Sequence, residues 1–307
     1  MSAYDLKSYA LALKLRSKKT ILVEGPSDKK VLSRMLLERE QVQKKARNCV
    51  IDDVALLSRE PKLSKLGNRA RVEAVVQTLE AQCPNLNWLM DREWEGLDSA
   101  GARYTESGEG NDRGFRTRGH SIENYWFENQ PLSGYIKQLH GHDLSADFFG
   151  VLDLRFPQML LTAAAVSLVA GAENIISSMN SLVSRHHFSW DGSNYHPAPQ
   201  LNIDAKLRHI EVDIVAKIIE RQQIINSNSD SHDELRWICH GHIGEQVLRA
   251  CAAHLAAESG AEEGVCAQIE RGHHAIKLLH DADWLARAPV TQISPLDKLL
   301  DWGSSSA

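Results

Sequence analysis

The sequence predicts an α/β fold, a parallel sheet flanked by helices, followed by a mainly α-helical C-terminal part. Short apolar runs of strand type alternate with helical patterns over the first 90 or so residues. The order strand, helix, strand, helix, strand is typical of a parallel sheet with right-handed crossovers. Later in the chain, apolar residues recur mostly at helical spacing. We therefore expect an α/β domain over residues 1–135, a helical domain over 136–302 and a disordered tail over 303–307.

The first strand is predicted at Ile21-Leu22-Val23, because these residues are apolar and partly β-branched. Gly25-Pro26 ends the strand, and Ser27 is a natural N-cap for a helix over Lys29–Glu38. This helix has an apolar stripe that suits packing on a sheet, formed by Val31, Leu32, Met35 and Leu36.

Three further strands are predicted. The second begins at Cys49-Val50-Ile51 and extends toward Leu57. After a helix that follows Gly67-Asn68, the third strand covers Leu86–Met90. The run Ile122–Phe127 is expected to form the fourth.

The second half is mostly helical in pattern. Leu160–Val183 suits one or two buried helices, Ser189–Gln200 a loop, and Ile203–Ile225 a long helix whose apolar stripe packs in the core or in an oligomer contact. Ser227–Asp230 is predicted to be a polar linker, followed by a capping box at Ser231 and Glu234.

Composition narrows the class of protein. No N-terminal segment has the order of a signal peptide, and the longest nearly apolar run, Met159–Val169, is too short to span a bilayer. We expect a cytoplasmic protein that does not insert in membranes. The five cysteines include no CxxC pair and read as reduced core thiols, and no histidine cluster has a standard zinc spacing. Walker, Rossmann and GxSxG motifs are also missing from the sequence, which argues against ATP or NAD binding by those means.

Charge is distributed unevenly along the chain. Residues 1–71 carry 17 Lys and Arg against 8 Asp and Glu, whereas residues 72–150 carry 6 against 13 and residues 151–307 carry 12 against 19. The basic clusters around Lys14–Lys19 and Lys44–Arg47 suit a face that binds nucleic acid or an acidic protein, although solvated helix faces have the same composition.

Carboxylates follow two of the predicted strands. Glu24 comes directly after the first strand, Asp28 lies four residues on, and Asp91 and Glu93 follow the third strand. The carboxyl ends of parallel strands share one edge, where ligands of α/β sheets bind. If the strand conformation persists, Asp91 and Glu93 point to the same side. Converging carboxylates suit Mg²⁺ or Mn²⁺, so we expect a metal site here. The alternatives are that Asp28 only complements the helix dipole, that Glu24 only accepts hydrogen bonds from backbone N–H groups of the turn, and that the acids form a solvated turn.

Residues 96–110 read as a flexible loop above this site. Arg113, Arg116 and Arg118 then surround an aromatic residue, a composition that suits phosphate and base contacts. Lys29 and Lys30 are further expected nucleic-acid contacts. In the following strand, Glu123 is expected either to bind metal or to form a salt bridge, and His120 either to act as a general acid or to cap the strand.

Three segments of residues 20–127 together carry a family resemblance: Val23-Glu24-Gly25-x-x-Asp28, Asp91-Arg92-Glu93, and His120-Ser-Ile-Glu-Asn-Tyr125. They resemble the TOPRIM fold of topoisomerases, primases and the overcoming-lysogenization-defect nucleases. More narrowly, they resemble the stand-alone TOPRIM-like family that includes the effector nuclease of the PARIS phage-defence system. The common pattern has Asp-x-Asp where this chain has Asp91-Arg92-Glu93.

The resemblance implies a TOPRIM-like catalytic domain over residues 1–135 and a metal-dependent endonuclease. Glu24, Asp91 and Glu93 would be catalytic, and Asp28 and Glu123 would complete the Mg²⁺ or Mn²⁺ ligands. It further implies a toxin of anti-phage defence that an ABC-type ATPase partner holds inactive, and that cleaves host tRNA as a homodimer once released. A DNA nuclease or nickase of the same superfamily and a TOPRIM-like binding module without catalysis are the alternatives.

Overall fold

The computed structural model describes residues 4–98, 100, 102–104, 113–179, 181–228 and 234–305. The chain divides into two compact units: unit 1 takes residues 1–92, 107–118 and 278–307, and unit 2 takes residues 93–106 and 119–277. This division differs from the boundary expected at residue 135, because residues 278–305 pack with the N-terminal sheet rather than with the helices that precede them.

Unit 1 contains a four-stranded parallel sheet in the order β2-β1-β3-β6. Its strands are β1 (Lys19–Val23), β2 (Cys49–Asp53), β3 (Leu86–Met90) and β6 (Gly114–Arg116). Val23 is aligned with Asp53, and Met90 with Arg116. The predicted parallel α/β sheet with flanking helices and a mostly helical second part is therefore confirmed.

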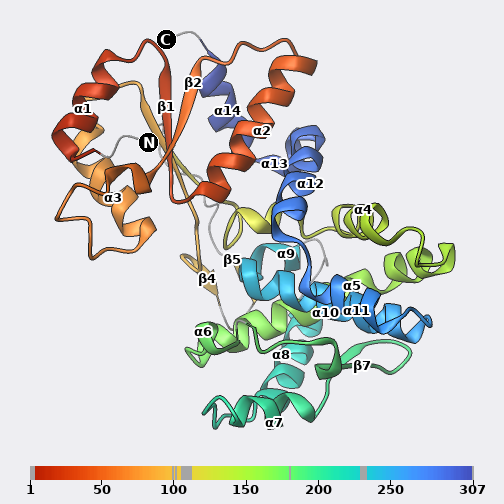
Figure 1. Cartoon of the computed structure of the whole chain (residues 1–307). Coiled ribbons are helices and arrows are strands. Elements are labelled where there is room, and N and C mark those ends of the chain that lie inside the picture. The colour runs from red at the N-terminus through yellow and green to blue at the C-terminus, as the bar shows by residue number, and fades with distance from the viewer. Residues whose placement is uncertain are drawn as a thin grey trace. The chain divides into compact units, whose positions relative to one another are not determined.

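Helices cover both faces of this sheet (Figure 1). On one face, α1 (Leu6–Leu15) and α3 (Asn68–Leu79) share a core with Leu22 and Trp88. The other face carries α2 (Pro26–Val42) and α14 (Leu296–Ser304), where a side chain on Gly303 would come within 2.7 Å of Cys49 Sγ. Residues 303 and 304 are thus helical rather than part of a disordered tail, and residues 306–307 lie outside the described part.

Two local predictions near the site were wrong. The helix after β1 begins at Pro26 with Gly25 as N-cap, rather than after Ser27, because Pro26 suits the first helical position and Asp28 accepts a hydrogen bond from the Gly25 N–H. The second strand ends at Asp53, and Val54–Leu57 form the short 3-10 helix η1.

The predicted fourth strand at residues 122–127 is a 3-10 helix, η2 (Ile122–Trp126), and β6 takes the place of that strand in the sheet. The reason is local side-chain bonding. The buried Asn124 side chain accepts a hydrogen bond from the Ser121 N–H at 2.7 Å and donates to the carbonyls of Arg236 at 2.5 Å and Cys239 at 2.8 Å.

Unit 2 is built around two helices with many small residues, α5 (Ala146–Ala172) and α10 (Gly241–Glu258). Buried alanines on both helices allow close approach of their backbones. One described helix, α5, is long and apolar enough to cross a membrane, and 72% of its most apolar window is buried inside the structure. The other elements from residue 129 on are α4 (Asn129–His140), α6 (Ile176–Met179), η3 (Arg185–His187), α7 (Gln200–Lys206), α8 (Ile214–Asn228), α9 (Leu235–Ile238) and α11 (Glu263–Arg271); α12 (His274–Arg287) leads from unit 2 into unit 1, and α13 (Val290–Ile293) follows it.

Two segments of unit 2 differ from their predicted state. The expected loop at 189–200 contains a hairpin of β7 (Phe188–Trp190) and β8 (Tyr195–Pro197), and the expected helix 203–225 is interrupted between α7 and α8. The flexible loop expected at 96–110 contains the strand pair β4 (Leu97–Asp98) and β5 (Arg103–Tyr104), while 99, 101 and 105–110 lie outside the described residues. Residues 229–233, with Ser231 of the expected capping box, also lie outside them.

Candidate functional site

Acidic residues gather at the carboxyl edge of the sheet in unit 1. Glu24 follows β1, Asp53 ends β2 and Asp91 follows β3. Because the strands are parallel, these three positions share one edge, which is where α/β sheets bind ligands.

Glu24 and Asp91 are joined directly. Glu24 Oε1 accepts a hydrogen bond of 2.8 Å from the Asp91 backbone N–H, although the two residues are 67 positions apart in the chain. Both residues are only partly buried. The bond fixes the start of the turn after β3 against the end of β1, so it holds the Asp91 backbone at the tip of the sheet.

Asp28 lies in the first turn of α2, at the same edge as Glu24. Its Oδ2 accepts a hydrogen bond of 2.9 Å from the Gly25 N–H, and its charge complements the helix dipole. Asp28 thus has the helix-dipole role that the sequence left open, and it also caps the start of α2. This bond uses one carboxylate oxygen.

Asp53 is a carboxylate that our sequence analysis missed. Its Oδ2 pairs with Lys29 Nζ at 3.2 Å. Lys29, which was expected to contact nucleic acid, therefore contacts an acid at the same edge of the sheet. The signal was present in the sequence, since Asp52-Asp53 follows an apolar strand just as Asp91 does.

The neighbouring Asp52 points to the opposite face of the sheet. There it contacts Arg16 at 2.5 Å and accepts a hydrogen bond of 3.1 Å from the Tyr9 hydroxyl. Burial, with the Asp52 charge as a second cause, raises the pKa of Tyr9 well above its ordinary value. Asp52 is therefore a core residue, and Asp53 is the acid that belongs to the edge.

The predicted basic residues separate. Arg116 is aligned with Met90 at the carboxyl end of β6, and Arg118 follows two residues later. Arg113 precedes β6, at the other end of the strand, and donates from Nη1 to the Glu80 carbonyl at 2.8 Å. Lys30 is exposed on α2. Of the three arginines, the structure thus brings Arg116 and Arg118 to the acidic edge.

Arg92, which lies between Asp91 and Glu93 in the sequence, is buried. Its backbone N–H donates to Thr117 Oγ1 at 2.9 Å, and its guanidinium donates to the Arg118 carbonyl at 3.2 Å. Arg92 therefore ties the segment that follows β6 to the turn that follows β3.

Glu93 and Glu123 belong to unit 2. Glu93 has a left-handed backbone, with a φ of 55°, and its N–H donates to the His120 carbonyl at 2.7 Å. The extended conformation thus does not continue to Glu93, which removes the reason to expect its carboxylate on the same side as that of Asp91. Glu123 lies against the start of α10, where a side chain on Gly241 would come within 2.7 Å of Glu123 Oε2, and the helix dipole favours this carboxylate.

Two aromatic side chains of unit 2, Trp94 and His240, pack against His120. Its ring lies 4.9 Å from that of Trp94 and 4.5 Å from that of His240. Burial, followed by the charge of His242, lowers the pKa of His240 to about 4. His120 lies before the 3-10 helix η2, so it does not cap a strand. At neutral pH the neighbouring His240 is uncharged.

The donors at the edge of unit 1 suit a hard divalent cation. Mg²⁺ is commonly held by one or two carboxylates while it keeps several waters, and Glu24 and Asp91 provide two. Within the described residues, no group of three or more His, Cys, Asp or Glu side chains is arranged to hold a metal ion. A carboxylate pair with retained water is a donor set that Mg²⁺ accepts, and the metal site stays a prediction.

Neither a protein-family model nor a curated protein sequence matches this chain.

Proposed function

We propose that the protein is a Mg²⁺- or Mn²⁺-dependent TOPRIM-type nuclease. The observation that carries this proposal is the hydrogen bond from the Asp91 N–H to Glu24, which joins two acids at the carboxyl edge of a parallel sheet. Arg116 and Arg118 supply positive charge at the same edge, as binding of a phosphodiester requires.

Glu24 and Asp91 would hold the metal ion, with Asp28 as a further oxygen donor. When bound, such an ion lowers the pKa of a bound water and stabilises the oxygen that leaves phosphorus. Arg116 and Arg118 would orient the phosphate, and Lys29, paired with Asp53, would exchange that acid for a phosphate oxygen.

The substrate and the partners rest on the resemblance of the three segments described above. We favour tRNA as substrate, a homodimer as the active form, and an ABC-type ATPase that holds the nuclease inactive in the cytoplasm until a phage is sensed. A DNA nuclease of the same superfamily uses the same carboxylates, and parallel incubation with tRNA and plasmid separates the two.

The test compares Glu24→Gln with Glu24→Ala. A glutamine oxygen still accepts the hydrogen bond from the Asp91 N–H, but it loses the charge that a cation requires. We expect both variants to lose cleavage of tRNA and Mn²⁺ binding measured by electron paramagnetic resonance, while Glu24→Gln keeps the stability of the wild type. A fully active Glu24→Gln protein would show that Glu24 only positions the turn, and the metal-site proposal would fall.

A second candidate function is a binding module without catalysis. It is favoured by the engagement of Asp28 with the Gly25 N–H and of Asp53 with Lys29, since both acids have structural roles. Under this alternative the wild-type protein binds no Mn²⁺ and cleaves nothing. The Mn²⁺ titration above, made on the wild type with its ATPase partner and without it, distinguishes the two functions.

A further inference from the structure

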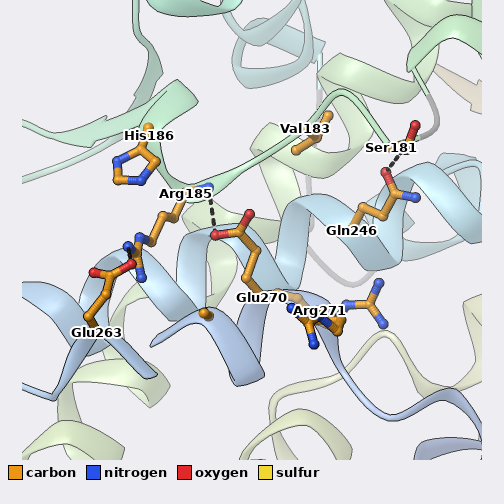
Figure 2. A pocket seen from close by; sticks show the side chains of 10 residues that line it. Ser181, Val183, Arg185, His186, Gln246, Glu263, Glu270 and Arg271 are labelled. Atoms are coloured by element: carbon orange, nitrogen blue, oxygen red, sulfur yellow. Dashed lines mark hydrogen bonds and ion pairs between the residues drawn. The ribbon is translucent and has the colours of Figure 1, made fainter. Parts of the chain in front are cut away.

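A pocket of about 510 Å³ opens within unit 2, between η3, α10 and α11 (Figure 2). Its walls carry three arginines, Arg185, Arg249 and Arg271, and two acids, Glu263 and Glu270. The volume lies within the range of about 300 to 1,000 Å³ that is typical of small-molecule sites. No residue of the acidic sheet edge lines this pocket.

Arg185 is the most buried of the three arginines, with a side chain only 7% exposed. Its Nη2 pairs with Glu263, as Figure 2 shows. Its Nη1 is buried and has no hydrogen-bond partner in the described part of the chain. A buried donor without a partner is unfavourable, and more so on a charged group.

The ion pair between Arg185 and Glu263 is easily broken. The Glu263 side chain is 78% exposed, so it can turn into solvent without burying its charge. An oxyanion in its place would accept from both Nη atoms of the guanidinium, the bidentate geometry that arginine favours. In the structure, Glu263 accepts from one of these two nitrogens, Nη2.

Arg249, the second arginine, is held in place by residues that do not line the pocket. Arg249 Nη1 donates to Glu245 Oε1 at 3.2 Å, and Lys277 Nζ lies 3.5 Å from the same oxygen. Gly272 ends α11 with a φ of 65°, and a side chain there would come within 2.6 Å of Arg249 Nη1. Glycine at this position therefore leaves room for the guanidinium beside the pocket.

We propose that this pocket binds a small organic molecule through a phosphate monoester. When Glu263 turns out, Arg185 and Arg271 face one acid, Glu270, while Arg249 and Lys277 share another, Glu245. This excess of two positive charges matches a phosphate dianion rather than a single carboxylate. The volume exceeds that of the phosphate alone, and Val183, Ala267 and the Gln246 amide line the rest. The inference does not depend on the proposed nuclease function, because the two sites share no residue.

The experiment is calorimetric titration of the full chain with AMP, inorganic phosphate and adenosine at one ionic strength. We expect AMP and phosphate to bind and adenosine not to bind. Arg271→Gln, at an exposed position, should weaken AMP binding about tenfold or more. Glu263→Gln should strengthen it severalfold, since it removes the competing charge.

A matched control makes the result specific. Lys137→Gln removes an exposed charge outside the pocket and should leave AMP binding unchanged. Failure of both AMP and phosphate to bind at millimolar concentration would overturn the proposal. Equal affinity in wild type and Arg271→Gln would also overturn it, as would weaker AMP binding in Glu263→Gln, which would show that Glu263 does not compete with the phosphate for Arg185.

Discussion

Replacing Gly114 by alanine should disrupt the sheet of unit 1 by a purely steric effect. Gly114 is aligned with Trp88 in the neighbouring strand, and the indole covers it. A Cβ on Gly114 would lie 1.7 Å from Trp88 Cε2, 2.0 Å from Cζ2 and 2.4 Å from Cδ2. Carbon atoms in contact prefer about 3.5 to 4.0 Å. Either the indole or strand β6 must therefore move by more than an ångström.

The expected cost follows from this geometry. Overpacking a well-filled core costs about 1 to 3 kcal/mol and occasionally more. We place this change at the upper end, because Trp88 is only 7% exposed and both strands are hydrogen-bonded. Alanine also restricts the unfolded chain, which returns about 0.4 to 1 kcal/mol. The net destabilisation should be about 2 kcal/mol.

The assay is native-state hydrogen exchange of the peptide that contains Leu86–Met90, since it reports on this sheet rather than on unit 2. Trp88→Val removes the indole and costs about 3 kcal/mol by itself, but Gly114→Ala should then add less than about 0.5 kcal/mol. Gly67→Ala, where no atom lies within 4 Å of the new Cβ, is the control in the same unit. If Gly114→Ala leaves exchange unchanged, or if Trp88→Val does not relieve its effect, the steric argument is refuted.

Three further predictions concern other parts of the chain. A chain that ends at residue 294 loses α14, whose Leu296, Leu299 and Leu300 are fully buried. Burial of each of these side chains stabilises the fold by about 1.5 to 3 kcal/mol, so we expect the shortened protein to aggregate. A soluble, monomeric protein with intact hydrogen-exchange protection in β1 would contradict this. Asn124→Ala should destabilise unit 2 by about 3 kcal/mol in urea unfolding, because the Ser121 N–H and the carbonyls of Arg236 and Cys239 lose their hydrogen-bond partner. A loss under 1 kcal/mol would show that η2 does not depend on these hydrogen bonds. The folded-state pKa of His240, about 4, lies below its ordinary value of 6.5, so between these values the unfolded chain binds a proton that the folded chain does not. Stability should therefore fall as the pH drops from 6.5 toward 4, and less steeply in His240→Asn; identical slopes would refute the assignment.

The strands that could be predicted are those marked by their own residues. Ile21–Val23 and Leu86–Met90 are apolar runs ended by turns, and the structure confirms both. Strand β6 has no such run: it is Gly-Phe-Arg, and its glycine lies under the Trp88 indole of the neighbouring strand. Likewise, η2 replaces a predicted strand because Asn124 finds carbonyls more than 110 residues away.

The candidate site divides in the same way. Glu24 and Asp91 could be placed at one edge from strand order alone, and their positions in the sheet follow that order. Asp53 could have been found by the same rule. The left-handed backbone of Glu93 could not have been predicted, because it depends on the hydrogen bond to the His120 carbonyl rather than on neighbouring residues.

The division of unit 1 along the chain has a consequence for its synthesis. Buried Lys19, at the start of β1, donates to the Trp302 carbonyl at 3.0 Å and to Ser305 Oγ at 2.6 Å. A nascent chain cannot complete the cover of this face, which α2 begins, until residues 296–305 have left the ribosome, after the residues of unit 2. Glu24 and Asp91 thus gain their full support only after unit 2 has been synthesised, so fragments of an interrupted chain would carry the acids without a finished sheet to hold them.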